Sequence, residues 1–434
     1  MNPGHALAGA QFRAIILSTA VRDLCGSRDW ANRYERIMLN EFNWDQRYRV
    51  SGVEDVLTPA LVLYPDLIAA NIQQTLNLLE GDADRWRAHI KTAKLGFTLH
   101  MLVERGIRNF KCATTLELLV ACQNGAADVL LAYPVMGANA HRAQEIARQF
   151  PEVRISVLAE NEDQVRQWQA SRVGVFLDIN PGMNRTGIEQ SQTDRVVRLA
   201  RAITDAGLEF RGLHYYDGQF GGLVDGEGKG GRTQAAHLGY DRLLEIVSDL
   251  NRSGVSVPEV ITSGTPTFPS SLTYEGFRHG NFLHRVSPGT IVYCDATSLE
   301  QLPSKYGYQP AALVLTRVVS HPHPGIVTCD AGHKTVSADA GIPTCLVLGH
   351  PELTPLSPSE EHLPLKVAQE ATAPQVGDIL YLLPRHICPT VNNFDCALLA
   401  RNGDIDALER VSARGREAPL LKTVEQAFSL DRNR

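Results

Sequence analysis

Regular alternation between short β-type runs and amphipathic helical patterns, over residues 58–295, is the feature that most limits the fold of this chain. After a first β run at 59–64, candidate strands lie at 88–92, 110–114, 128–134, 153–158, 173–179, 210–216, 259–263 and 289–294. Helical patterns separate most of them, at 65–79, 116–125, 138–150, 194–206 and 235–254. Such alternation predicts a parallel sheet. About eight units over roughly 240 residues favour a closed (β/α)8 barrel, so we expect an α/β fold of the TIM-barrel type.

An open, doubly wound sheet is the alternative, and the residues after the first β run disfavour it. A Rossmann-type sheet should carry the pattern G-x-G-x-x-G at that point. Here Tyr64-Pro65-Asp66-Leu67 stands there instead.

The pattern changes after Asp295, where helical periodicity nearly vanishes and prolines and glycines become frequent. Short β runs then dominate, at 312–319, 325–329, 344–348 and 378–383. They predict a smaller, mainly antiparallel β-domain. We therefore expect a helical extension over 1–55, a barrel domain over 56–304 and a β-domain over 305–434, with a polar surface tail at the end.

Charge and hydropathy exclude several classes of partner. The net charge is -6 and no basic run offsets it, so we expect no binding to nucleic acid. The apolar stretch at 14–21 is too short to span a membrane. The 8 cysteines are scattered without a C-x-x-C pair, which is typical of reduced thiols rather than a disulfide framework. We expect a soluble, cytoplasmic protein.

Lys91 lies at the end of the predicted buried strand 88–92. Burying an ammonium without a partner is costly, so such a position favours the neutral amine. A neutral amine is the form that a Schiff base with an aldehyde cofactor requires. The alternative is a solvated lysine just past a strand end.

Other polar clusters follow later strands, where a barrel places its functional residues. Ser263-Gly264-Thr265 follows the seventh predicted strand, and its hydroxyls and amides could bind a phosphate; an ordinary turn is the alternative. Arg185 follows the fifth and could bind an anionic oxygen, or form an ordinary ion pair. The cluster 287–290 is expected to lead into the eighth strand.

A His386-x-Cys388 pair follows the predicted strand at 378–383. In an extended segment both side chains would point to the same face. Imidazole and thiolate are favoured zinc ligands, and two ligands would leave positions open for water or substrate. A buried cysteine beside a hydrogen-bonded histidine is the alternative. His362 is a further candidate to face this pair.

Together these motifs resemble the fold-type III pyridoxal-phosphate enzymes, in particular the branch of D-serine dehydratases and D-threonine aldolases. The matching pieces keep the family's order: Thr58-Pro59-Ala60, His89-Ile90-Lys91-Thr92, 182–187, Tyr216-Asp217-Gly218, Ser263-Gly264-Thr265, Pro288-Gly289-Thr290, Asp330-Ala331-Gly332, 359–362 and His386-x-Cys388. Two features depart from the family. Ala93 stands where histidine is frequent, and the first fifty residues have no counterpart.

The resemblance implies roles for the site residues. Lys91 matches the catalytic lysine that forms the Schiff base with pyridoxal 5'-phosphate, and Arg185 and Tyr216 match contacts to the cofactor ring or substrate. Ser263, Gly264 and Thr265 match the phosphate loop, and His386 and Cys388 match the ligands of Zn2+. The resemblance also implies a homodimer with a shared active site.

The activity implied is that of a lyase acting on D-3-hydroxy amino acids. The first candidate is D-serine dehydratase, which converts D-serine to pyruvate and ammonia. The His386-x-Cys388 pair of this chain resembles that of the zinc-dependent D-serine dehydratases, whereas His-x-Asp is typical of the aldolases. The alternative is an aldolase acting on D-threonine or 3-hydroxy-D-aspartate. An amino-acid racemase and a non-catalytic binder of the cofactor are further alternatives; the racemase would need a second base opposite Lys91.

Overall fold

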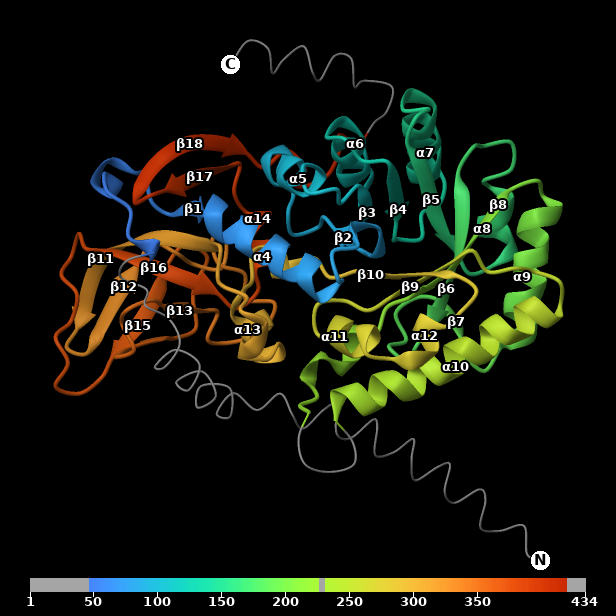
Figure 1. Cartoon of the computed structure of the whole chain (residues 1–434). Coiled ribbons are helices and arrows are strands. Elements are labelled where there is room, and N and C mark those ends of the chain that lie inside the picture. The colour runs from blue at the N-terminus through green and yellow to red at the C-terminus, as the bar shows by residue number, and fades with distance from the viewer. Residues whose placement is uncertain (1–46, 226–230, 420–434) are drawn as a thin grey trace, which may run out of the picture.

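The computed structural model describes residues 47–225 and 231–419, and it contains two β-sheets with helices packed around one of them (Figure 1). The predicted helical extension lies mostly outside the described residues, as does the end of the predicted tail. No helix within the described ranges is long and apolar enough to cross a membrane.

The first sheet is the predicted barrel. Its strands run parallel in the order β10-β9-β8-β6-β5-β4-β3-β2, and a bridge between Trp86 and Val286 joins its two ends. The strands are β2 (Arg87–His89), β3 (Asn109–Cys112), β4 (Asp128–Leu131), β5 (Arg154–Ala159), β6 (Gly174–Asn180), β8 (Glu209–Tyr215), β9 (Glu259–Thr262) and β10 (Leu283–Val286). A two-residue strand, β7 (Ile188–Glu189), pairs with the end of β6.

Helices cover the outside of the barrel, on the right of Figure 1. They are α4 (Pro65–Leu78), α5 (Gly96–Val103), α6 (Thr115–Gln123), α7 (Ala138–Gln149), α8 (Glu162–Arg166), α9 (Thr193–Asp205), α10 (Arg232–Arg252), α11 (Phe268–Leu272), α12 (Glu275–Arg278) and α13 (Ala296–Gln301). Short 3-10 turns join them at η1 (Val53–Asp55), η2 (Ala83–Arg85), η3 (Gly218–Gly222), η4 (Thr290–Val292) and η5 (Ser304–Tyr306).

The prediction of an eighth strand at 289–294 is wrong. The eighth barrel strand is β10, and the cluster 287–290 follows it instead of leading into it. Ile291 and Val292 are apolar because they are buried in the η4 turn, whereas β10 carries the polar residues His284 and Arg285. A short apolar run does not by itself distinguish a strand from another buried segment.

The second sheet is mixed and mostly antiparallel, in the order β14-β15-β12-β11-β1-β17-β18, with β16 beside β11 and β13 beside β16. Its strands are β11 (Ala312–His323), β12 (Ile326–Cys329), β13 (Cys345–Val347), β14 (Leu353–Pro355), β15 (Leu363–Val367), β16 (Ile379–Pro384), β17 (Cys396–Arg401), β18 (Asp404–Arg410) and β1 (Ala60–Leu63). The first β run of the chain thus joins this sheet, antiparallel to β11 and parallel to β17.

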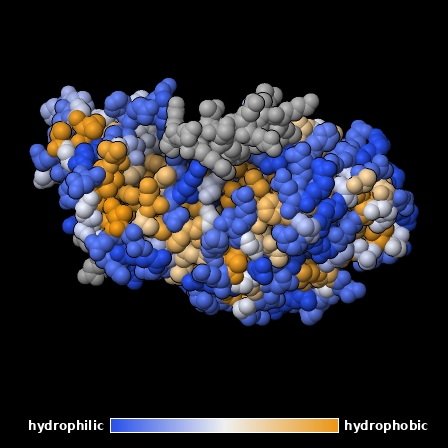
Figure 2. Space-filling view, turned by 90° about the horizontal axis from the view of Figure 1, so that it is seen from above, coloured by the Kyte–Doolittle hydropathy of each residue, from blue (hydrophilic) through white to orange (hydrophobic). Residues whose placement is uncertain are grey.

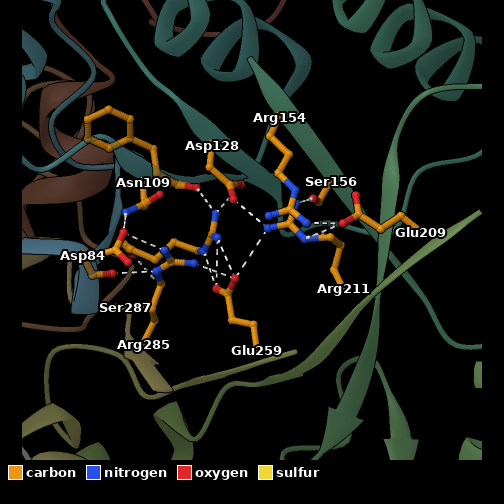
Figure 3. Close-up of polar contacts among 12 residues, drawn as sticks. Asp84, Asn109, Asp128, Arg154, Ser156, Glu209, Arg211, Glu259, Arg285 and Ser287 are labelled. Atoms are coloured by element: carbon orange, nitrogen blue, oxygen red, sulfur yellow. Dashed lines mark hydrogen bonds and ion pairs between the residues drawn. The ribbon is translucent and has the colours of Figure 1, made fainter. Parts of the chain in front are cut away.

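Charged side chains fill the barrel interior at the amino ends of its strands (Figure 3). Arg87 binds Asp128 at 2.8 Å and Glu259 at 3.0 Å. Arg211 binds Asp128 at 2.6 Å, and Arg285 binds Glu259 at 2.6 Å. Burial alone would raise the pKa of Asp128, but Arg87 and Arg211 hold it well below its usual range. Each buried charge therefore has an opposite charge in contact.

An apolar layer lies next to this network. It consists of Leu130, Leu158, Phe176 and Ile261, which form a cluster separate from the main core. The guanidinium carbons of Arg87 and Arg211 lie 5.9 and 5.3 Å from the centroid of the Phe176 ring, so this ring joins the two layers. Side-chain layers of this kind are typical of closed barrels.

Glu259→Gln should lower the free energy of unfolding by about 3 kcal/mol, because it leaves the buried charges of Arg87 and Arg285 without their shared carboxylate. Urea unfolding followed by circular dichroism measures this. The matched control is Glu209→Gln, whose side chain is 49% exposed and should cost less than about 1 kcal/mol. Equal losses for the two variants would contradict the structural role of the network.

Candidate active site

The carboxyl ends of the barrel strands bring the predicted site residues together. Lys91 lies in a turn two residues after β2, which ends at His89, so the predicted strand 88–92 is too long. The side chain is half-buried, and its backbone N–H donates to His89 Nδ1 at 3.3 Å. Its Nζ has no hydrogen-bond or ion-pair partner among the described residues. The amine is therefore available to a ligand.

Ser263-Gly264-Thr265 directly follows β9. The hydroxyls of Ser263 and Thr265 are buried, and neither has a hydrogen-bond partner within the described structure. A side chain at Gly264 would place its Cβ 2.8 Å from Cε2 of Tyr216, so any larger residue would have to displace the Tyr216 ring. Buried hydroxyls are almost always hydrogen-bonded, and two adjacent orphans indicate a ligand rich in acceptor oxygens. The loop fits a phosphate group.

Tyr216 lies between this loop and the cationic residues of the site. Its half-buried ring contacts Gly264 on one side. The guanidinium carbon of Arg185 lies 4.9 Å from the ring centroid, and Nζ of Lys111 lies 5.7 Å from it. Arg185 is otherwise exposed, so it remains free to bind an anion.

Asp217 links the segment after β8 to the segment after the phosphate loop through side-chain hydrogen bonds. Its buried carboxylate accepts hydrogen bonds from Tyr240 Oη at 2.6 Å and from Thr267 Oγ1 at 2.5 Å. Burial raises the pKa of this carboxyl. Because Tyr216 precedes it and Thr267 lies just after the Ser263 loop, this contact positions both.

Three polar residues inside the barrel have no role predicted from the sequence, although Asp178 and His214 begin polar clusters at the ends of predicted strands. Lys111 Nζ lies 3.4 Å from His214 Nε2, and His214 Nδ1 lies 2.7 Å from Asp178 Oδ1; all three side chains are buried. The signal for Lys111 was present, because a lysine interrupts the buried strand Asn109-Phe110-Lys111-Cys112.

His386 and Cys388 belong to the β-domain, and they lie near Lys91, which belongs to the barrel. Cys388 Sγ lies 2.9 Å from Thr92 Oγ1 and 3.5 Å from Thr290 Oγ1, both on barrel loops. The prediction of an extended segment is wrong here: His386 caps the short helix α14 (Ile387–Val391), and Cys388 lies in its first turn. The backbone N–H of Ile387 donates to Asp295 Oδ2 at 2.9 Å, which fixes the helix to the barrel.

The two side chains still meet. Burial alone would lower the pKa of His386, but hydrogen bonds to Asp339 and Cys388 raise it to about 11. Burial alone would raise the pKa of Cys388, but His386 and the charge of Lys91 lower it overall. His386 Nδ1 lies 2.6 Å from Asp339 Oδ2. A histidine and a thiolate in contact, with the histidine oriented by a carboxylate, suit a zinc ion, which would replace the proton that His386 shares with Cys388.

This pair would supply two metal ligands. Within the described ranges no group of three or more His, Cys, Asp or Glu side chains could hold a metal ion. His362 is exposed, and its backbone rather than its ring bonds to Ser359. The structure therefore does not bring His362 to the site.

The chain matches two known families. Residues 64–297 match the alanine racemase N-terminal domain, and residues 311–400 match a serine dehydratase domain. It is 27% identical over 382 residues to D-threonine aldolase of Arthrobacter sp., covering 82% of this chain and 93% of that protein. It is 26% identical over 377 residues to 3-hydroxy-D-aspartate aldolase of Paracoccus denitrificans, covering 83% and 93%.

A more distant relative is D-threo-3-hydroxyaspartate dehydratase of Delftia sp., 22% identical over 378 residues and covering 82% of this chain and 97% of that protein. Among solved structures, D-threonine aldolase from Filomicrobium marinum superposes with a TM-score of 0.75 at 26% identity, covering 85% and 99%.

Thr265→Val should weaken the binding of inorganic phosphate without destabilising the ligand-free protein, because the hydroxyl that it removes is buried and unpaired. We expect unchanged stability or a gain of up to about 1 kcal/mol. Calorimetric titration with phosphate and urea unfolding measure the two effects. The control Thr267→Val removes a hydrogen bond to buried Asp217 and should cost about 1–3 kcal/mol. Equal destabilisation by both variants would contradict a ligand-binding role for Thr265.

Proposed function

Since the chain belongs to the family of the alanine racemase N-terminal domain, we propose that it dehydrates D-3-hydroxy amino acids, with D-serine as the first candidate substrate. Its homologues are pyridoxal-phosphate lyases of D-amino acids, and the chain is a lyase of this kind. The observation that carries the dehydratase assignment is the contact between His386 and Cys388 beside the loop of Lys91.

Tyr216 and four residues near it would hold the cofactor. Ser263, Gly264 and Thr265 would bind the phosphate through two unpaired hydroxyls and an unobstructed backbone. Tyr216 would pack against the ring, and Arg185 would bind an anionic oxygen. When bound, pyridoxal phosphate supplies an electron sink for the negative charge that develops at the substrate's α-carbon.

Lys91 is the proposed base. Its Nζ has no partner among the described side chains, so it can take a proton from the α-carbon without first breaking an ion pair. Thr92, the next residue, contacts Cys388, so the same loop orients the base and the metal-binding pair toward one another.

His386 and Cys388 would hold Zn2+, with Asp339 orienting the imidazole through Nδ1. A bound zinc ion supplies Lewis acidity toward the substrate's β-oxygen, which helps hydroxide to leave. In D-serine the products are pyruvate and ammonia.

An aldolase activity is the second candidate, because two of the relatives named above are aldolases at 27% and 26% identity. The same residues would serve both reactions. In the aldolase reaction the bond between Cα and Cβ breaks, and D-threonine gives glycine and acetaldehyde.

We also propose a cytoplasmic homodimer. Leu57 and Leu408 are 91% and 66% exposed, and large exposed apolar residues are typical of interaction surfaces. Figure 2 shows an apolar area on the side of the β-domain. A second copy covering this area is consistent with the dimer that the family resemblance implies.

Incubating the zinc-loaded holoenzyme with D-serine, D-threonine and 3-hydroxy-D-aspartate tests the proposed reaction. We expect D-serine to release pyruvate and ammonia, measured by coupled lactate dehydrogenase and glutamate dehydrogenase assays. Glycine and acetaldehyde from D-threonine, with D-serine inert, would establish the aldolase instead. A chelator should stop turnover while the cofactor stays bound; full activity of metal-free protein would remove zinc from the proposal.

Lys91→Ala should abolish the visible absorbance band of the bound cofactor and lower kcat by roughly 10²–10⁴-fold or more, because the variant lacks both the attaching amine and the base. Spectra and initial rates measure this. The matched control is Lys94→Met on the same loop. Lys94 pairs with Glu117 at 2.6 Å, so its loss should lower stability but leave the band in place. A Lys91→Ala protein that keeps the band would rule Lys91 out.

A further inference from the structure

We propose that Lys111 is a further residue of the cofactor site: His214 and Asp178 hold its amine on the floor of the barrel mouth, where it binds the anionic ring oxygen of pyridoxal phosphate. This inference rests on the cofactor assigned above. It extends the site to a residue that neither the sequence motifs nor the phosphate loop indicated.

A hydrogen-bonded chain fixes Lys111. Lys111 is 2% exposed on β3, and its Nζ lies 3.4 Å from His214 Nε2. His214 Nδ1 lies 2.7 Å from Asp178 Oδ1, and these two residues are direct partners on β6 and β8. A neutral imidazole satisfies both contacts, since its Nδ1–H donates to the carboxylate and its Nε2 accepts from the amine.

The chain of three lies toward the open end of the barrel. Lys111 is paired in register with Leu130 on β4, and His214 with Ile261 on β9. These two apolar residues belong to the cluster with Leu158 and Phe176. The Phe176 ring contacts Arg87 and Arg211 of the ionic network, and Asp178 lies two residues further along β6 on the same face, so the chain of three lies on the side of Phe176 away from that network. On the open side, Lys111 faces the ring of Tyr216, the same ring that Arg185 and Gly264 contact.

Lys111 lacks an anion. Within the described residues its contacts are His214 and the Tyr216 ring, and neither carries a negative charge. The nearby carboxylates are already engaged, Asp178 with His214 and Asp217 with Thr267 and Tyr240. A buried cation without an anion is costly, so a ligand should supply one. Pyridoxal phosphate has two anionic groups, its phosphate and its ring oxygen. Because Ser263 and Thr265 suit the phosphate, the ring oxygen is the group left to bind Lys111.

The charge of Lys111 should change near neutral pH. Burial lowers its pKa to about 7; Lys91 and Arg185 act in the same direction, while Asp178 and Asp217 oppose it. His214 contacts it as a neutral imidazole, and burial lowers the pKa of His214 as well. Lys111 is therefore protonated below about pH 7, where it binds an anion best, and this binding weakens as the pH rises through that value.

Titration of the apoprotein with pyridoxal phosphate, followed by tryptophan fluorescence, tests the assignment. The measured quantity is the ratio of Kd in Lys111→Met to Kd in the wild type, because the ratio cancels the pH dependence of the other groups. We expect a ratio of at least ten at pH 6, falling toward one at pH 8.5. The surface variant Lys305→Met should give a ratio of one throughout.

Asp178→Asn provides a second, near-isosteric test. Because the charge of Asp178 raises the pKa of Lys111, its loss should move the pH step in cofactor affinity to lower pH. Thermal unfolding of each apoprotein establishes that the variant is folded. If Lys111→Met does not fold, Asp178→Asn decides alone: cofactor affinity that changes at the same pH as in the wild type would overturn the proposal.

Two further outcomes would overturn it. A ratio of one at every pH would show that Lys111 does not contact the cofactor. Unchanged cofactor affinity with a tenfold higher KM for 3-hydroxy-D-aspartate would assign Lys111 to the substrate instead. Wild-type protein that binds no pyridoxal phosphate would refute the proposed function itself, an outcome distinct from both.

Discussion

The buried ion-pair network at the amino ends of the barrel strands is the interaction on which the rest of the structure depends. Arg87, Arg211 and Arg285 are neutralised by three carboxylates, those of Asp128, Glu259 and Asp84. The Phe176 ring joins this network to an apolar layer. This end of the barrel is therefore closed and electrically balanced. Cationic groups without an ion-pair partner among the described residues are left at the carboxyl ends, where Lys111 and Arg185 face the Tyr216 ring. That asymmetry decides where an anionic ligand can bind.

Contacts between the two domains complete the site. The first strand of the chain, β1, is built into the second sheet between β11 and β17, so the two domains are joined before the barrel begins. The loop of Lys91 is then held from both sides. Thr92 contacts Cys388 of α14, and Lys94 binds Glu117 and the carbonyl oxygen of Ala413. The proposed base and the proposed metal ligands are therefore positioned by the same packing.

Much of this architecture was predictable because the barrel strands are short, buried and separated by helices of clear periodicity. The loops after the strands, which carry Lys91, Arg185, Tyr216 and Ser263, were found because polar residues stand out after apolar runs. The eighth strand was misplaced since β10 carries His284 and Arg285, which hide its strand pattern. Lys111 was missed for a related reason: one lysine within four residues of strand gives no indication of which side it faces.

The sequence by itself determined the order of elements, the barrel and the chemical types present, because hydrophobic periodicity and turn residues act locally. Only the tertiary structure decided which polar groups meet. It brings Cys388 to Thr92 across 296 positions and His214 to Lys111 across 103. It also leaves the hydroxyls of Ser263 and Thr265 without partners. Contacts of this kind depend on how sheets close and pack, and no local pattern in the chain records them.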